Sequence, residues 1–239
     1  MAKKVFITGA NKGIGKQIAR QMGRNGWTVL VGARNEDRGL AAVHELSEED
    51  IKAEYLNIDL QDSKTILAVV HTIESRYTDL SMLINNAAIP GDMHKPGHEF
   101  TTDELRKVME TNFFGPFELT RRLLPTLEAN NGRIVNVTIP IGTLPFFNPF
   151  AYKTSKAAFN VMAQSFAQNF TEKNKALEIF SIMPGATTTD LNGNITGEYV
   201  KTAEESGRLI TGIILDGKNH NGELMNTNGA IVDYNHGLF

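Results

Sequence analysis

A tyrosine and a lysine four residues apart, Tyr152 and Lys156, form a pair of side chains that could do acid chemistry. At this spacing two residues lie on one face of a helix, so their side chains would be neighbours. A phenol with its ordinary pKa of about 10 is a weak acid near neutral pH. Because a nearby ammonium group favours the phenolate, Lys156 would lower that pKa and help Tyr152 donate a proton to a substrate oxygen. The alternative is a helix in which the tyrosine only packs and the lysine is solvated.

A glycine-rich stretch near the N-terminus, TGANKGIG, could hold a phosphate group. It follows an apolar run and precedes an amphipathic helical pattern. Glycines allow a tight turn and a close backbone approach, and the N-terminus of the following helix attracts a pyrophosphate. We therefore expect a dinucleotide here, although the spacing departs from G-x-G-x-x-G; the alternative is a plain turn between a strand and a helix. The expected contacts are Gly9, Asn11, Lys12, Gly13, Ile14 and Gly15.

The end of the second apolar run carries cations rather than the acidic residue that would hold the ribose hydroxyls of NAD. Arg34 and Arg38 stand there, and Lys12 lies in the glycine-rich stretch itself. Three cations can converge on a 2′-phosphate, which arginine binds in a bidentate way. The sequence therefore favours NADPH over NADH. The alternative is a solvated set of basic residues paired with the nearby Glu36 and Asp37.

Short apolar runs rich in Val and Ile alternate with longer amphipathic segments along the whole chain. The apolar runs predict strands at residues 4–8, 28–33, 53–59, 80–85, 133–138, 177–183 and 229–234. The segments between them predict helices at residues 13–25, 36–46, 63–76, 102–128, 152–172 and 202–214. Strands that are apolar on both faces and separated by helices are typical of a parallel sheet. We predict an α/β fold with a single doubly wound parallel sheet of about seven strands, helices on both faces and one domain over residues 1–239.

Composition and charge argue against several other classes of protein. The chain has 41% hydrophobic and 21% charged residues, as globular proteins do, and its net charge of −3 argues against a nucleic-acid-binding face. It has no cysteine, which excludes disulfides and thiolate metal sites and fits a reducing compartment. No apolar run reaches the roughly 18 residues of a membrane span, and the first apolar run is too short for a signal peptide. We therefore predict a cytoplasmic protein with no membrane or nucleic-acid partner.

Five motifs follow one another in a fixed order: TGANKGIG, LINNAAI, METNFFG, YKTSK and PGATTTD. In this succession the chain resembles the short-chain dehydrogenase/reductase family over nearly its whole length. The glycine-rich stretch, the GARNEDRG segment and PGATTTD look most like the NADPH-dependent carbonyl reductase branch of that family. The resemblance implies a Rossmann-type fold, NADP(H) as cofactor and a small carbonyl compound as substrate. It also implies a homodimer or homotetramer paired through the helices at 102–128 and 152–172.

The resemblance also implies roles for the residues that match the family's motifs. Asn112 would be catalytic together with Tyr152 and Lys156, supporting the lysine through a water molecule. Tyr152 and Lys156 would also contact the cofactor. The other implied cofactor contacts are Asp59 and Leu60 at the adenine ring, Asn86, Ala87 and Ala88 in the segment that resembles NNAG, and Pro184, Gly185 and Thr189 at the nicotinamide carboxamide. Ala88 stands where the family usually has a glycine, and its methyl group narrows the permitted φ range.

One position departs from the family's catalytic pattern. The family has a serine thirteen residues before the tyrosine, and this chain has Ile139 there, within the sequence NVTIPIG. Isoleucine has neither a donor nor an acceptor, and removing one such donor costs about 10²–10³ in rate. The neighbouring Thr138 would point away from the site if the strand continues, because successive side chains alternate in direction. A bulge, or strain before Pro140, could instead turn Thr138 towards the substrate.

The expected substrate side is apolar. The residues in question are Ile89, Pro90, Ile139, Ile141, Leu144, Phe146, Phe147 and Phe150. With residues 187–200 as a mobile lid, they would enclose an uncharged hydrophobic aldehyde, ketone or quinone; the alternative is that half of them only pack the loops. His94 and His98 are interpreted as surface or rim residues, so we expect no metal site.

Two functions are compatible with these residues. The first is an NADPH-dependent oxidoreductase that reduces a hydrophobic carbonyl, with Tyr152 as proton donor and with catalysis weakened by Ile139. The second is a non-catalytic NADPH-binding sensor or regulatory protein on the same fold. The retained Asn112, Tyr152 and Lys156 favour the enzyme, and Ile139 favours the sensor.

Overall fold

The computed structural model describes residues 3–141 and 148–232, and its centre is a parallel sheet. In the described chain the sheet has seven strands in the order β3-β2-β1-β4-β5-β6-β7. The strands are β1 (Lys4–Thr8), β2 (Thr28–Ala33), β3 (Ala53–Asn57), β4 (Leu80–Asn85), β5 (Arg133–Val137), β6 (Glu178–Met183) and β7 (Leu224–Asn226). The chain reverses its direction of travel across the sheet between β1 and β4. This is the topological switch point, where ligands of such sheets bind outside the carboxyl ends of the strands.

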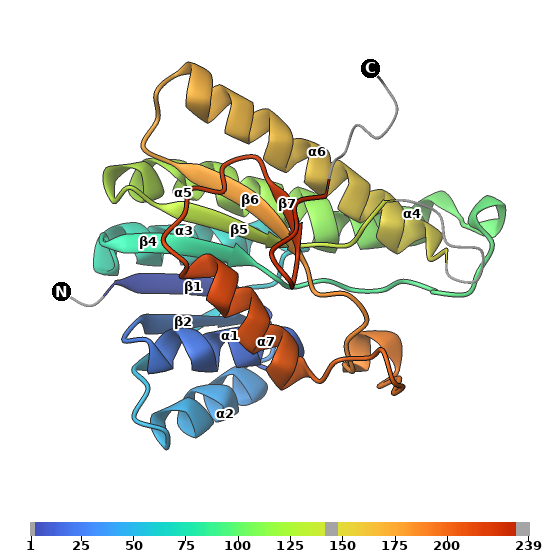
Figure 1. Ribbon diagram of the computed structural model, residues 1–239, viewed down its shortest axis with the longest axis horizontal. Helices are drawn as coiled ribbons and strands as arrows, with labels where there is room; N and C mark the ends of the chain where they lie inside the picture. Colours follow the sequence, from blue (N-terminus) through green and yellow to red (C-terminus); the bar gives the residue numbers. More distant parts are fainter. Residues whose placement is uncertain (1–2, 142–147, 233–239) are drawn as a thin grey trace.

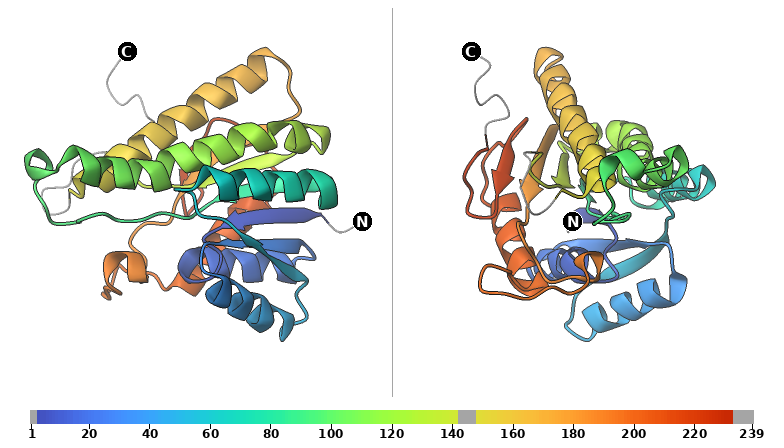
Figure 2. Two further views of the ribbon diagram at one scale, coloured as in Figure 1. Left: turned by 180° about the vertical axis from the view of Figure 1, so that it is seen from behind. Right: turned by 90° about the vertical axis from the view of Figure 1, so that its right-hand side faces the viewer.

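Helices cover both faces of the sheet, as predicted. They are α1 (Gly13–Arg24), α2 (Glu36–Ser47), α3 (Ser63–Arg76), α4 (Thr102–Met109), α5 (Gly115–Ala129), α6 (Phe150–Glu172) and α7 (Ala203–Ile214). Neighbouring residues of a strand enter different cores: on β4, Leu83 packs with Phe159 of α6, whereas Ile84 packs with Ile18 of α1 and Ile210 of α7. Figure 2 shows α3, α5 and α6 side by side on one face of the sheet. The apolar character of both strand faces, from which the parallel sheet was predicted, therefore has a direct structural cause.

The carboxyl ends of the strands face one side of the molecule, which is the right-hand side in Figure 1. The start of α6 and the orange segment after β6, which contains the short 3₁₀ turn Asp190–Asn192, lie on the same side. The sheet thus brings the glycine-rich stretch, the tyrosine helix and the expected lid to one edge.

The last predicted strand is wrong in position. The strand lies at Leu224–Asn226, where Leu224 and Met225 are buried, and not at 229–234. Gly229 adopts a left-handed φ of 81°, and the side chain of Asn226 accepts a hydrogen bond from the backbone of Ala230. The chain therefore turns after β7 and returns to it through an antiparallel bridge between Met225 and Ile231. Residues 233 and 234 lie outside the described part of the chain.

The long helix predicted at 102–128 is interrupted. A π-helical turn, Glu110–Phe114, separates α4 from α5. Gly115, the first residue of α5, packs closely against Leu60. A Cβ at this glycine would lie 2.8 Å from the Cβ of Leu60, so the close approach requires glycine. A π-turn inserts one extra residue into a helix and is frequent at functional sites. Here it contains Asn112, one of the predicted catalytic residues.

Two of the predicted helices begin with a threonine N-cap. Thr101 and Glu104 form the complete reciprocal capping box before α4. Thr202 accepts a hydrogen bond from the backbone of Glu205 before α7. The tyrosine helix α6 begins at Phe150, two residues before the predicted start.

Candidate active site

The glycine-rich stretch forms a tight cradle between β1 and α1. Gly9 has a left-handed φ of 67°, and a Cβ there would lie 2.9 Å from the Cα of Ala87. A Cβ on Gly15 would lie 2.5 Å from the carbonyl oxygen of Gly9. Asn86, the residue after β4, fixes the cradle, because its Nδ2 donates to the carbonyl oxygen of Thr8 at 2.9 Å. Only glycine fits at these two positions, and residues 11–14 of the loop are partly or fully exposed.

The N-terminus of α1 is suited to an anion. The first turn of α1 contains no acidic residue, and the N-cap residue Lys12 makes no side-chain capping bond. The free N–H groups of such a helix start and its positive dipole favour a phosphate. Together with the glycine cradle, this fits the pyrophosphate of a dinucleotide. Of the six residues predicted to bind it, Gly9, Asn11 and Lys12 lie in the turn between β1 and α1, and Gly13, Ile14 and Gly15 form the first turn of α1.

Of the three cations predicted to bind the phosphate, only Lys12 forms an ion pair within the described residues. Arg34 and Arg38 are exposed at the end of β2 and the start of α2, and in the described residues neither forms an ion pair. The alternative pairing with Glu36 and Asp37 is therefore absent from this region. Lys12 instead donates to Asp190 of the expected lid at 2.7 Å.

The remaining predicted contacts of the adenine side lie at the ends of β3 and β4. The carboxylate of Asp59 accepts a hydrogen bond from the backbone of Gln61 at 3.0 Å, and the side chain of Leu60 is buried in the core. Ala88 is half-buried and is not among the residues with positive φ. Its methyl group therefore causes no backbone strain, and the departure from the family's glycine is tolerated.

Asn112 joins three segments of the site. The residue is fully buried; its Oδ1 accepts from the backbone of Ile89 at 2.8 Å, and its Nδ2 donates to Ser155 Oγ at 3.0 Å. Ser155 Oγ in turn donates to the carbonyl oxygen of Tyr152 at 2.7 Å. The amide thus fixes the loop after β4 and the first turns of α6 relative to the π-turn. Ser155 sits between the two residues of the Tyr-x-x-x-Lys pair, and no sequence motif pointed to it.

Tyr152 and Lys156 lie on one face of α6, as predicted, but the tyrosine pKa shifts in the opposite direction. Lys156 is 2% exposed; its Nζ donates to the carbonyl oxygen of Val137 at 2.8 Å and lies 5.7 Å from the centre of the Tyr152 ring. Burial raises the pKa of Tyr152 to about 12 and lowers the pKa of Lys156 to about 8. The prediction of a lowered tyrosine pKa is therefore wrong for this arrangement. Desolvation favours the neutral form of both groups, and the ammonium group faces a backbone carbonyl.

Thr138 does not replace the missing serine. Its hydroxyl donates to Oδ1 of Asn160 on α6 at 2.7 Å, and the residue is 2% exposed. The backbone of Thr138 still donates to Ile182 of β6, so the strand pairing continues to this point and the side chains alternate as predicted. Ile139 is half-buried, and its carbonyl oxygen accepts from Asn160 Nδ2 at 3.3 Å. The position of the expected serine therefore holds an apolar side chain, and its neighbour's hydroxyl proton is engaged elsewhere.

The segment after β6 lies against the glycine cradle. It begins with Pro184 and with Gly185, which has a left-handed φ of 74°. Thr189 caps the turn Asp190–Asn192, and its Cγ2 lies 3.6 Å from the position that a Cβ on Gly13 would take. Two segments that are predicted to bind the cofactor and lie far apart in the sequence are thus brought together. Lys201, which no sequence motif singled out, also reaches this segment: its Nζ lies 3.1 Å from the position of a Cβ on Gly185.

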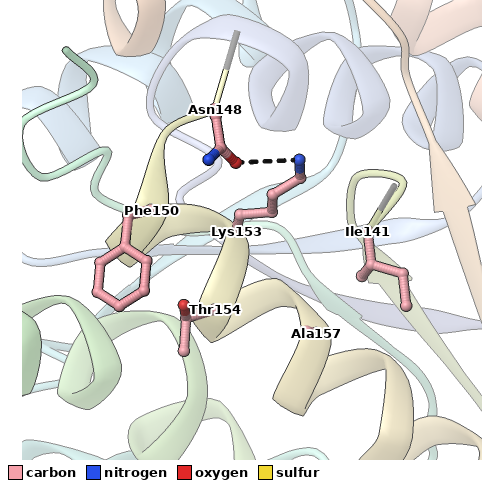
Figure 3. Close-up of a pocket in the computed structure, with 6 residues that line it drawn as sticks. All are labelled: Ile141, Asn148, Phe150, Lys153, Thr154 and Ala157. Carbon is pink, nitrogen blue, oxygen red and sulfur yellow. Dashed lines mark hydrogen bonds between the residues drawn. The ribbon is translucent and has the colours of Figure 1, made fainter. Parts of the chain in front are cut away.

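The apolar residues of the expected substrate side divide between two hollows. The first has a volume of about 200 Å³ and is lined by Ile141 and by Phe150, Lys153 and Thr154 of α6. Figure 3 shows these residues, with the side chain of Lys153 turned towards Asn148. Ile89 and Pro90 line a second hollow of about 360 Å³, together with Arg34 and Lys107. Ile139 lines neither. Leu144, Phe146 and Phe147 lie outside the described residues.

Two other features concern metals and membranes. His94 and His98 are exposed, as predicted, and the described residues hold no cluster of three potential metal-ligating side chains. Among the helices of the same part of the chain, none combines the length and the apolar character needed to span a bilayer.

Known proteins resemble this chain over most of its length. The family model described as short chain dehydrogenase matches residues 3–199. The short-chain dehydrogenase anuI of Penicillium roqueforti is 31% identical, with 96% of each chain covered. A 3beta-hydroxysteroid dehydrogenase of Mediterraneibacter gnavus is 30% identical, covering 79% of this chain and 67% of that protein.

Solved structures share the fold and include complexes with NADP or NADPH. A short chain dehydrogenase structure from Shigella flexneri complexed with NADP is 26% identical, covers 95% of this chain and 97% of that one, and has a TM-score of 0.84. The NADPH-bound carbonyl reductase from chicken fatty liver has a TM-score of 0.85 at 21% identity, with 98% and 99% covered. Together with the glycine cradle and the tyrosine helix, these matches show that the chain belongs to the short-chain dehydrogenase family of oxidoreductases.

Proposed function

We propose that this protein is an NADPH-dependent oxidoreductase that reduces a hydrophobic ketone, aldehyde or quinone. The observation that carries the proposal is the convergence of Tyr152, Lys156 and the Asn112–Ser155 hydrogen bond at the sheet edge that also holds the glycine cradle. This edge lies next to the switch point between β1 and β4, where ligands of doubly wound sheets bind. NADP is the cofactor named for the Shigella flexneri structure, which supports the choice of cofactor.

The residues present fit NADP(H). The glycine cradle and the start of α1 would hold the pyrophosphate, and Lys12, Arg34 and Arg38 would meet the 2′-phosphate. The other proposed contacts are Asp59, Leu60, Asn86, Ala87 and Ala88 on the adenine side, and Tyr152, Lys156, Pro184, Gly185 and Thr189 on the nicotinamide side. When bound, the cofactor supplies the hydride.

In the proposed reaction, the phenol of Tyr152 donates a proton to the carbonyl oxygen of the substrate. Lys156 lies one turn further along the same face of α6, with its Nζ 5.7 Å from the centre of the Tyr152 ring, and Asn112 and Ser155 fix the helix on which both stand. Ile139 supplies no donor to the substrate oxygen, so we expect turnover about 10²–10³ slower than with a serine there. Carbonyl compounds that are already activated, such as diketones and quinones, suit such a site.

The test follows the loss of NADPH absorbance over a panel of diketones, quinones and aldehydes, with native protein and Tyr152→Phe. Phenylalanine keeps the ring and removes the hydroxyl, so we expect turnover to disappear while the Kd for NADPH stays within a few-fold. Equal turnover by both proteins would show that Tyr152 is not the proton donor.

The second proposal, a non-catalytic NADPH-binding sensor, is favoured by one observation. Ile139 leaves the substrate oxygen without its usual partner, and Thr138 is bonded to Asn160 instead. A protein that binds NADPH but turns over no carbonyl compound in that panel would have this function.

We further propose a single cytoplasmic domain, with residues 187–200 as a substrate lid, that assembles as a homodimer or homotetramer. Phe114 beside α5 and Val161 on α6 are 47% and 61% exposed, which supports pairing through these helices. Size-exclusion chromatography with light scattering would test this, and a monomer at micromolar concentration would contradict it.

A further inference from the structure

One ion pair joins the glycine cradle to the segment after β6. Lys12 Nζ donates to Asp190 Oδ2 at 2.7 Å, across 178 positions of sequence. Lys12 is the N-cap residue of α1, and Asp190 is the first residue of the 3₁₀ turn Asp190–Asn192. Lys12 is also one of the three cations proposed to meet the 2′-phosphate of NADPH. The carboxylate of Asp190 therefore already binds the ammonium group that the 2′-phosphate of the cofactor would use.

Local structure places the carboxylate of Asp190 at this point. Thr189 and Asn192 form a capping box around the turn, and Asn194 Nδ2 donates to Asp190 Oδ1 at 3.3 Å. Thr189 lies directly over Gly13 of the cradle. The turn is thus held against the loop by its own hydrogen bonds and by packing.

Arg38, a second of the three cations proposed to meet the 2′-phosphate, also acts on the carboxylate of Asp190. The pKa of Asp190 lies below its ordinary value because of the hydrogen bonds from Lys12 and Asn194 and the nearby charges of Lys12 and Arg38. Asp190 is therefore ionised near neutral pH and lies within the positive field of two of the three cations. A phosphate that enters this field meets a negative charge already there.

We propose that Asp190 is a cofactor-specificity residue that weakens the binding of NADPH relative to NADH by holding Lys12. The inference rests on the proposed function, because it assumes that Lys12 meets the 2′-phosphate. NADPH binding would require Lys12 to leave Asp190 or to share its ammonium group with both anions. NADH has no 2′-phosphate, so its binding leaves the ion pair intact.

The expected effect is modest, because both partners are exposed. The side chains of Lys12 and Asp190 are 53% and 60% exposed, and such pairs are weak and screened by salt. Releasing Lys12 should therefore tighten NADPH binding by about fivefold at low ionic strength. The gain should shrink as salt is added.

The experiment measures the Kd of NADPH and of NADH by isothermal titration calorimetry for native protein, Asp190→Asn, Lys12→Gln and the double variant. Glu74→Gln serves as the control, because it removes the same charge from an exposed position near the far end of α3. We expect Asp190→Asn to tighten NADPH about fivefold and to leave NADH unchanged. Glu74→Gln should change neither, and in the Lys12→Gln background the effect of Asp190→Asn should fall below about twofold.

Two results would overturn the inference alone: NADPH binding that is unchanged or weaker in Asp190→Asn, or an equal change for both cofactors. The second result would mean that Asp190 holds the lid closed over any dinucleotide. Native protein that binds neither cofactor, or a Lys12→Gln variant that binds NADPH as native protein does, would overturn the assignment of the phosphate site as well. Circular dichroism of each variant checks that the exposed substitutions leave the fold unchanged.

Discussion

Replacing Lys156 by methionine should stabilise the protein at neutral pH while abolishing the proposed activity. Lys156 is 2% exposed, and burial lowers its pKa from 10.5 to about 8. The folded protein therefore binds this proton less tightly than the unfolded chain does, and the charge costs folding free energy. That cost is fully present below about pH 8 and is relieved as the pH rises from about 8 towards 10.5. Methionine keeps a long side chain and carries no charge, so it removes the cost.

Two opposing terms set the size of the effect. The difference in pKa corresponds to about 3 kcal/mol at about 1.4 kcal/mol per pKa unit. The substitution also removes the hydrogen bond from Nζ to the carbonyl oxygen of Val137, and an unpartnered buried acceptor costs about 1–3 kcal/mol. We therefore expect Lys156→Met to be about 1 kcal/mol more stable than native protein at pH 7. At pH 10 the charge cost is mostly gone, so the variant should be the less stable protein.

Urea denaturation followed by circular dichroism at pH 7 and pH 10 measures both values. Other groups titrate in native protein and variant alike, so the difference between the two proteins isolates Lys156. A change of sign between the two pH values would support the reasoning. A stability difference that is the same at both, or a variant that is less stable at pH 7, would refute it.

Two further substitutions test the geometry of the site. Gly15→Ala should weaken NADPH binding and lower the free energy of unfolding by about 1–3 kcal/mol, because a Cβ would lie 2.5 Å from the carbonyl oxygen of Gly9. Gly212→Ala on α7 is the matched control: a Cβ there meets nothing within 4 Å, so thermal unfolding should show a gain of up to about 1 kcal/mol. Equal changes in the free energy of unfolding for the two substitutions would contradict the close backbone contact assigned to Gly15. Thr138→Val should cost about 1–3 kcal/mol in urea denaturation, because it leaves Oδ1 of Asn160 without its donor, and should leave turnover within about twofold. A large loss of turnover with unchanged stability would place Thr138 in the site after all.

Much of the fold could be predicted because the apolar pattern of most segments matches the environment that each segment has in the folded protein. Strands such as β4, with Leu83 and Ile84 entering different cores, need apolar residues on both faces, and that pattern is visible without a structure. The glycines at 9 and 15 are required by close backbone approach, and this too is visible in the sequence. The last strand was misplaced because apolar residues after Gly229 look like a strand, whereas the turn formed by Asn226 and Gly229 reverses the chain.

The site was harder to predict where partners are distant in the sequence. Periodicity places Tyr152 and Lys156 on one face of α6, but it does not reveal that Lys156 bonds to Val137 or that burial dominates both pKa values. The ion pair of Lys12 with Asp190 joins two loops that come together only through the sheet. The direction of Thr138, by contrast, follows from simple alternation along β5 and was predicted.

The most direct test of the proposed reductase compares native protein with Ile139→Ser for the rate of NADPH oxidation over diketones, quinones and aldehydes. We expect slow but measurable turnover by native protein, abolished by Tyr152→Phe. We expect a rate up to about 10²–10³ higher in Ile139→Ser, because serine restores a donor at the substrate oxygen. Native protein that binds NADPH but reduces none of these compounds, while Ile139→Ser does, would contradict the claim that it is a reductase and would support the sensor.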